Sequence, residues 1–334
     1  MVRWLWLGIV LVGCGPGVMD DDDLADDDDV ADDDDATVGA PLLLTFAWHL
    51  EGWNWDDPAV YDQYMNVFLP DTHALLDGHG AKATMEVHTD LARNAPVGAF
   101  DSYVAAGHEV AVHADLGGNP NQPYGMPQFV QDLTERKAEL EGVAPGGAIR
   151  GVSGICSHLN WVAAARDAGF WLISGNVAWC TAAMANPPPE YANCQGAADC
   201  HDTYPWELAD RLQPWRVATV DGWLADDPAG DLVLLPSSGT LPCFAETRGG
   251  DPGATGCTFD QDDIDAFIAE LDDAVQLHQS EGGVHTLNLV WSFGQRPDAT
   301  LFGAWLSAID AYVADGRVSW ATATQAAEAW LIEQ

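Results

Sequence analysis

Three short stretches of this chain each carry an imidazole and a carboxylate two residues apart. Each pair stands at the end of an apolar, strand-like run, and the pairs are His49 with Glu51, Glu86 with His88, and His113 with Asp115. Because side chains two residues apart share one face of a strand, each pair can point to the same side of a sheet. Imidazole and carboxylate groups are ligands of zinc and similar divalent ions. The pairs therefore predict a metal or acid–base site, with zinc as the expected ion.

In the segments that must position these pairs, apolar residues recur either with the two-residue period of strands or with the 3.6-residue period of helices. Strand-like apolar runs are expected at 42–51, 81–88, 108–115, 147–152, 170–177, 215–222, 231–237, 285–293 and 317–323. Helical periodicity lies between them, at 58–78, 127–141, 158–168, 260–280 and 299–315. The helix at 260–280 can be capped by Thr258 with Gln261 or by Asp260 with Asp263. The alternation predicts an α/β fold with a parallel sheet, closed as a barrel or doubly wound, whose chemistry collects at the carboxyl ends of the strands.

Composition and missing motifs exclude several classes of protein. The 334 residues include 52 acidic and 12 basic side chains, for a net charge of −40, which argues against nucleic-acid binding. No G-x-G-x-x-G follows a strand, and the P-loop pattern is absent, so nucleotide binding has no support. The stretch 151–155, G-V-S-G-I, lacks the second glycine of G-x-S-x-G, which argues against a serine hydrolase.

The N-terminal residues indicate export. Residues 1–13 carry one positive charge and a short apolar run that ends in L-V-G before Cys14, which resembles a bacterial lipoprotein lipobox. The resemblance implies a lipidated Cys14 and a protein anchored to a membrane of the cell envelope, at the outer membrane or cell surface rather than in the cytoplasm. An ordinary secretory signal or a short anchor are the alternatives. Residues 14–40 hold three D-D-D-D blocks and are expected to form a disordered acidic tether before one domain at 41–334.

Six further cysteines favour disulfide bonds in an exported protein. They are Cys156, Cys180, Cys194, Cys200, Cys243 and Cys257. No C-x-x-C pair exists, which argues against a thiolate zinc site. Six cysteines leave the connectivity open, and our expectation is nearest-neighbour pairing, 156–180, 194–200 and 243–257.

Residues 107–113, G-H-E-V-A-V-H, resemble the G-H-E-φ-x-x-H stretch of polysaccharide deacetylases, the NodB-homology group or carbohydrate esterase family four. Neighbouring residues agree, because 80–84, G-A-K-A-T, resembles the family's G-x-x-A-T strand and Arg150 stands where the family has F-R-x-P. The likeness covers about 42–330. It implies a single-domain distorted (β/α) barrel, a divalent metal, and hydrolysis of N- or O-acetyl groups on a polysaccharide or other glycan.

Four departures from the family pattern change which residues carry over. The usual T-F-D-D reads T-F-A-W at 45–48, and His49-Leu50-Glu51 just downstream resembles the D-x-E variant of some members, with histidine replacing the aspartate. The second histidine of H-x-x-x-H falls on Gly117, Val152 replaces the proline of R-x-P, and no histidine occurs in L-V-W at 289–291. His113 and Arg150 therefore carry over directly.

The resulting hypothesis assigns a role to each polar residue. The metal ligands would be Glu51, His88, His113 and Asp115, with either His88 or Asp115 supplying the ligand that the family pattern lacks. His49 or Glu86 would act as general base, and Arg150 would orient a carboxylate. Trp48, Trp53 and Trp291 are candidates for stacking on sugar rings, or for packing in the core.

Two other functions remain open at the level of sequence. The first is a deacetylase-like barrel that has lost catalysis and binds glycan as a surface lipoprotein, which the missing histidines favour. The second is a glycoside hydrolase that uses Glu51 and Glu86 as its carboxylate pair, for which no motif speaks.

Overall fold

The computed structural model describes residues 39–51, 57–116, 125–155, 157–175, 211–248, 256–292 and 297–334. Several residues of the sequence analysis lie outside this part of the chain, namely Cys14 with the acidic tether, Trp53, Gly117, Cys156, Cys180, Cys194 and Cys200. None of the described helices is long and apolar enough to cross a membrane.

Within the described residues, ten strands form one curled sheet. The strands are β1 Leu42–Leu50, β2 Thr84–His88, β3 Glu109–Leu116, β4 Gly151–Ile155, β5 Leu172–Ile173, β6 Trp215–Val217, β7 Leu232–Leu234, β8 Gly239–Thr240, β9 Thr286–Ser292 and β10 Val318–Ala321. Their order is β6-β7-β5-β4-β3-β2-β1-β9-β8, and β10 also pairs with β1. Every pair is parallel except β6 with β7. This confirms the expected distorted (β/α) barrel.

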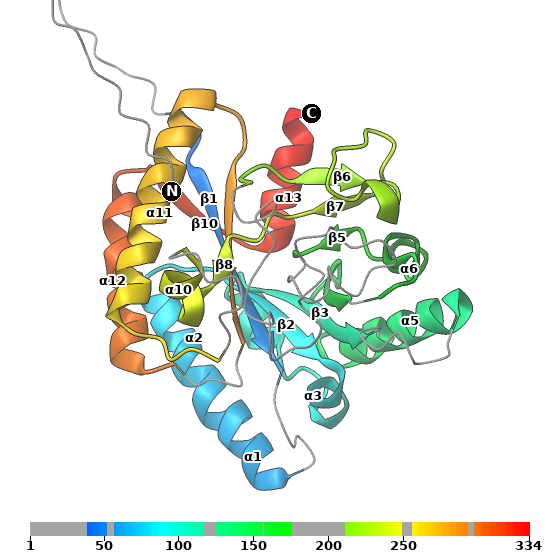
Figure 1. Cartoon of the computed structure of the whole chain (residues 1–334). Helices are drawn as coiled ribbons and strands as arrows, with labels where there is room; N and C mark the ends of the chain where they lie inside the picture. Colours follow the sequence, from blue (N-terminus) through cyan, green and yellow to red (C-terminus); the bar gives the residue numbers. More distant parts are fainter. Residues whose placement is uncertain are drawn as a thin grey trace, which may run out of the picture. The chain divides into compact units, whose positions relative to one another are not determined.

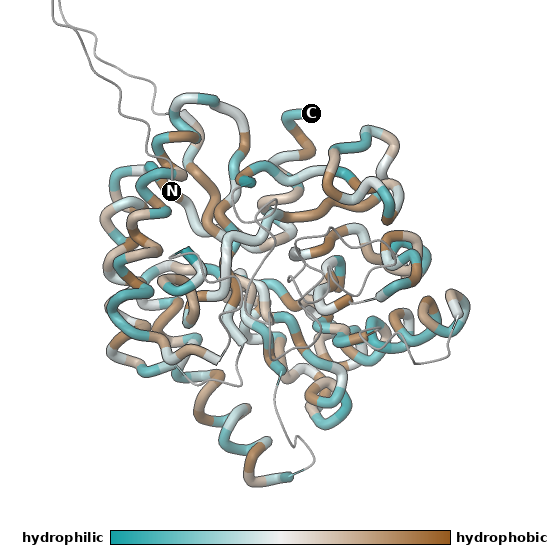
Figure 2. The backbone as a smooth tube through the Cα atoms, viewed as in Figure 1, coloured by the Kyte–Doolittle hydropathy of each residue, from teal (hydrophilic) through white to brown (hydrophobic). Residues whose placement is uncertain are grey.

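Helices cover the outside of this sheet (Figure 1). They are α1 Pro58–Gln63, the π-helical turn η1 Tyr64–Phe68, α2 Leu69–Gly78, α3 Thr89–Asn94, α4 Asp101–Ala105, α5 Met126–Val143, α6 Trp161–Asp167, η3 Val220–Gly222, η4 Leu241–Cys243, α10 Phe244–Arg248, α11 Gln261–Glu281, α12 Ala299–Ala314 and α13 Ala323–Glu333. The long helices show both hydrophilic and hydrophobic stretches along their length, as expected of amphipathic helices on a core (Figure 2). Asp260 caps α11 in a capping box with Asp263, which confirms one of the two predicted caps.

The two faces of β1 serve different purposes. Its even-numbered residues, Leu42, Leu44, Phe46, Trp48 and Leu50, all belong to the main hydrophobic core. Phe46, for example, lies against Phe302 and Trp305 of α12. The odd-numbered residues face the inside of the curl, where Thr45 donates a hydrogen bond to Asn288 of β9. His49 therefore points inward, because it shares the face of Thr45.

The Cys243–Cys257 disulfide joins η4 to the segment before α11. It confirms one of the three predicted pairs, while the other two lie outside the described residues.

Candidate active site

Four of the predicted site residues meet at the carboxyl ends of three neighbouring parallel strands. His49 lies near the end of β1, directly opposite Glu86 on β2, and Glu51 follows β1 immediately. His113 stands on β3, opposite Ser153 of β4. His49, Glu86 and His113 are all buried. The period-two pattern thus brought these side chains to one face, as the sequence predicted.

Glu51 lies between the two imidazoles. Its Oε2 is 3.1 Å from His113 Nε2, and its Oε1 is 3.8 Å from His49 Nδ1. The other nitrogen of His49, Nε2, is 2.7 Å from Glu86 Oε2. The two imidazole rings lie close together, with centroids 4.3 Å apart. A compact set of two imidazoles and one carboxylate results, with a second carboxylate behind His49.

Two serines complete the surroundings of this cluster. Ser153 Oγ is 2.9 Å from His113 Nδ1, and Ser174 donates a hydrogen bond to Glu86. Neither serine was predicted from sequence as a site residue. Ser153 stands beside His113 in the next strand, and Ser174 lies in the strand-like run predicted at 170–177, directly after β5.

Electrostatics within the cluster favour charged groups. Burial by itself would lower the pKa of His49, but Glu86 and Glu51 outweigh burial and raise that pKa to about 10. Burial would raise the pKa values of Glu51 and Glu86, but the neighbouring imidazoles hold both below the ordinary carboxyl value. A divalent cation would therefore compete with protons for the imidazole nitrogens.

The chemistry of this donor set fits a divalent metal. One ligand atom each from His49, Glu51 and His113 lies within 4.8 Å of the others. Zinc bonds of about 2.0–2.1 Å in a tetrahedron place neighbouring ligand atoms about 3.3 Å apart, close to the 3.1 and 3.8 Å separations from Glu51. Metal-bound histidines usually hold a polar partner on their other nitrogen. Glu86 and Ser153 occupy those positions on His49 and His113.

His88 and Asp115, the other predicted ligands, lie beside the cluster rather than in it. His88 caps α3, because its Nδ1 accepts the backbone N–H of Asp90. In neutral His88 the proton is consequently on Nε2, which then has no lone pair for a metal. Its ring centroid is 6.4 Å from that of His113, and its Nε2 is 4.0 Å from Asp115, whose side chain is 60% exposed. His49, expected as a base, takes the place of these ligands.

Three other predicted site residues lie elsewhere. Arg150 precedes β4 and so lies at the amino end of the sheet, where its guanidinium pairs with Glu328 of α13. It therefore orients no group in the cluster. Trp48 is 2% exposed and shares the core-facing side of β1, opposite to that of His49. Side-chain alternation corrects its assignment as a sugar-stacking residue.

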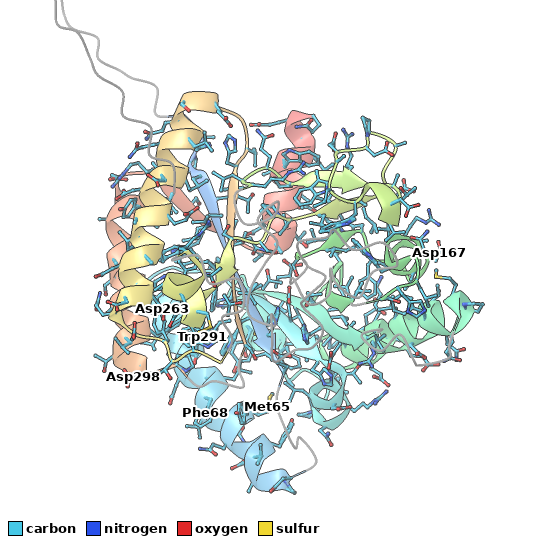
Figure 3. The ribbon with its side chains drawn as sticks, in the orientation of Figure 1. Met65, Phe68, Asp167, Asp263, Trp291 and Asp298 are labelled. Atoms are coloured by element: carbon cyan, nitrogen blue, oxygen red, sulfur yellow. A yellow bond between two sulfur atoms is a disulfide. The ribbon has the colours of Figure 1, made fainter. Side chains whose placement is uncertain are left out.

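Trp291 on β9 is also a core residue. Its ring lies 4.8 Å from that of Phe259 and 5.5 Å from that of Phe302, measured between centroids. Figure 3 shows it on the side of the sheet where α11 and α12 lie. This packing replaces its predicted role in sugar binding.

The contacts of His113 with Ser153 and Glu51 resemble the arrangement of a serine–histidine–acid triad. A nucleophilic serine must reach its substrate, and Ser153 is 3% exposed. The arrangement thus supports the metal-ligand geometry of His113 and gives no support to a serine hydrolase.

A second histidine cluster lies at the opposite, amino end of the sheet. His73 and Asp77 of α2 approach His108, with each imidazole Nε2 3.4 Å from an Asp77 oxygen. The Nδ1 of His108 accepts the backbone N–H of Ala83, so the proton of neutral His108 is on Nε2. Because this tautomer cannot offer Nε2 to a metal, the cluster is better described as part of the framework.

Comparison with known proteins identifies the fold. No protein-family model matches the chain, and no curated protein is significantly similar in sequence. Among solved structures, a protein described as a polysaccharide deacetylase from Mycobacterium smegmatis superposes with a TM-score of 0.55 and 20% identity, covering 88% of this chain and 92% of that one. Another protein described as a polysaccharide deacetylase, from Pseudomonas aeruginosa, superposes with a TM-score of 0.56 and 13% identity, covering 88% of this chain and 92% of that one. The Puue allantoinase superposes with a TM-score of 0.53 and 14% identity, covering 88% of this chain and 91% of that one. The chain thus shares the fold of polysaccharide deacetylases.

Proposed function

We propose that this protein is a metal-dependent hydrolase that removes acetyl groups from a carbohydrate at the cell envelope. The observation that carries the proposal is the cluster of His49, Glu51 and His113 at the carboxyl ends of the strands. In parallel α/β barrels this is the end where catalytic groups are found. The fold shared with polysaccharide deacetylases supports the choice of acetyl groups as the target.

His49, Glu51 and His113 would hold the ion. When bound, a divalent ion of this kind lowers the pKa of water towards about 7 and polarises a carbonyl group. Hydrolysis adds water to the acetyl carbonyl carbon and breaks the bond to nitrogen or oxygen. One proton must leave the water, and one must reach the departing amine or alcohol.

The residues around the cluster can serve both proton transfers. Asp115 is an exposed carboxylate that can accept a proton from water. His88, capped on Nδ1 by Asp90, presents an Nε2–H that can donate to the leaving group. Glu86 is excluded from direct proton exchange with substrate, because its side chain is fully buried behind His49. We therefore assign the base to Asp115 instead of His49 or Glu86.

The N-terminal sequence pattern supports a location at the cell envelope. The lipobox-like residues that end in Cys14 support a lipid anchor, and the acidic segment 15–40 supports a solvated tether between membrane and catalytic domain. A tethered enzyme of this kind would act on envelope or extracellular glycan.

The test is metal content together with acetate release. The purified protein, incubated with zinc, cobalt or nickel and desalted, should retain about one ion per chain and release acetate from acetylated chito- or xylo-oligosaccharides. His113→Ala should lose both properties, because a three-ligand set loses an imidazole. The matched control is His79→Ala, which removes a histidine paired with Asp310 on the helical surface and should retain both. Absence of bound metal in the wild type would refute the proposal.

A glycan-binding protein without catalysis is the second candidate. The outward position of Arg150 favours it, because the expected arginine is missing from the cluster. This function predicts measurable binding of the acetylated oligosaccharides with no acetate released at any metal concentration.

A further inference from the structure

Glu86 is the most enclosed charged group of the site, with 0% of its surface exposed. A buried carboxylate is costly unless donors satisfy its lone pairs. Two groups face the two oxygens of Glu86. His49 Nε2 lies 2.7 Å from Oε2, and the Ser174 hydroxyl donates a hydrogen bond to Oε1.

This arrangement fixes the orientation of protons on His49. An ionised carboxylate only accepts hydrogen bonds, so the Nε2 that faces Glu86 carries a proton. When His49 is neutral, its lone pair is then on Nδ1, the nitrogen that faces Glu51. Carboxylate–histidine pairs orient metal ligands in the same way in many metal sites.

We infer that Glu86 is the positioning residue of the candidate metal site, which sets the tautomer and orientation of the histidine ligand His49. The inference rests on the proposed metal site and replaces the sequence-based expectation that Glu86 acts as a base. A purely structural role would give Glu86 an effect on stability alone. A positioning role gives it an effect on metal affinity as well.

Glu86→Gln separates these roles. The glutamine amide presents N–H donors in place of one carboxylate oxygen, where His49 or Ser174 is already a donor, so at least one partner must reverse its hydrogen bond. Metal affinity should fall about 10–100-fold, the range for loss of such an outer partner. The measurement is competition for zinc or cobalt between the full-length protein and a chromophoric chelator, with the visible spectrum of bound cobalt as a second readout of the ligand geometry.

Glu109→Gln is the matched control. Glu109 is a buried carboxylate on the neighbouring strand β3, and Thr84 and Thr324 donate three hydrogen bonds to it. It lies at the first residue of β3, whereas the metal-binding cluster lies near the carboxyl ends of the strands. Its replacement should lower stability and leave the metal affinity and the cobalt spectrum unchanged.

The outcomes separate the inference from the proposed function. If the wild type binds no metal, both fail together. If the wild type binds metal and Glu86→Gln binds it as tightly as Glu109→Gln, the metal site stands and the positioning role is overturned. A selective loss in Glu86→Gln, with an altered cobalt spectrum, supports both.

Discussion

Gly154 gives a sharp test of how closely β4 packs against the metal-binding cluster. Its φ of +66° lies in the left-handed region that side chains disfavour. A Cβ at this position would lie 2.9 Å from the backbone nitrogen of Asp115 and 3.0 Å from Cε1 of His113. The contact with a backbone atom cannot be relieved by rotating a side chain. Gly154→Ala should therefore strain the backbone and displace the His113 imidazole.

The magnitude follows from two contributions. A left-handed alanine costs about 1–2 kcal/mol, and an overpacked contact adds about 1–3 kcal/mol. The free energy of unfolding should thus fall by about 2–4 kcal/mol, allowing for partial relaxation. For a domain of this size the midpoint of thermal unfolding should fall by roughly 3–7 °C.

The assay is thermal unfolding followed by circular dichroism, together with the zinc competition described above. Gly303→Ala is the control, because Gly303 lies within α12 and a Cβ there meets nothing within 4 Å. That variant should gain about 0.5–1 kcal/mol, since alanine favours the helix over glycine. An unfolding temperature for Gly154→Ala equal to that of the wild type, with unchanged zinc affinity, would refute the packing described here.

Three further predictions concern other parts of the chain. Burial raises the pKa of Asp263 to about 6, so the folded state holds this proton more tightly than the unfolded state. The resulting stability is present at low pH and is lost as the pH rises through about 6. The urea midpoint of Asp263→Asn relative to the wild type should consequently rise between about pH 4 and pH 7, and a difference independent of pH would contradict this. Replacing Cys243 and Cys257 by serine opens a loop with a sequence separation of 14 and should cost about 3 kcal/mol in urea unfolding, whereas an unchanged midpoint would show that the disulfide contributes nothing. Cys14→Ser should move the protein from the membrane fraction to the soluble fraction after cell lysis, and continued membrane association would rule out the lipid anchor.

Sequence periodicity was a good guide to the barrel and to the composition of the cluster. The i, i+2 spacing placed His49, Glu51 and His113 on faces that converge, because the neighbouring strands are parallel and in register. The longest amphipathic helices were predicted within a few residues of their observed ends, as at α11, Gln261–Glu281. These features depend on local pattern alone, which the sequence contains in full.

Other features depend on tertiary contacts that local pattern does not contain. Hydrogen bonds distinguish the candidate metal ligands from polar residues that only lie beside them. For example, the backbone N–H of Asp90 donates to His88 Nδ1, so His88 caps a helix. Arg150 matched a family position, but the start of β4 put it at the far end of the sheet. Short elements such as β8, Gly239–Thr240, and α10, Phe244–Arg248, carry too few residues to show a period.

The position of β1 in the sheet has a consequence for the order of folding events. One edge of β1 pairs with β9, while the other pairs with β10 along residues 42–45 and with β2 along residues 47–50. Strand β1 thus pairs with strands that lie more than 230 residues later in the chain, as in the Leu43–Thr286 pair. Contacts of such high sequence separation slow folding and leave apolar strands exposed during synthesis. An emerging chain therefore cannot complete the pairing of β1 until β9 and β10 are available.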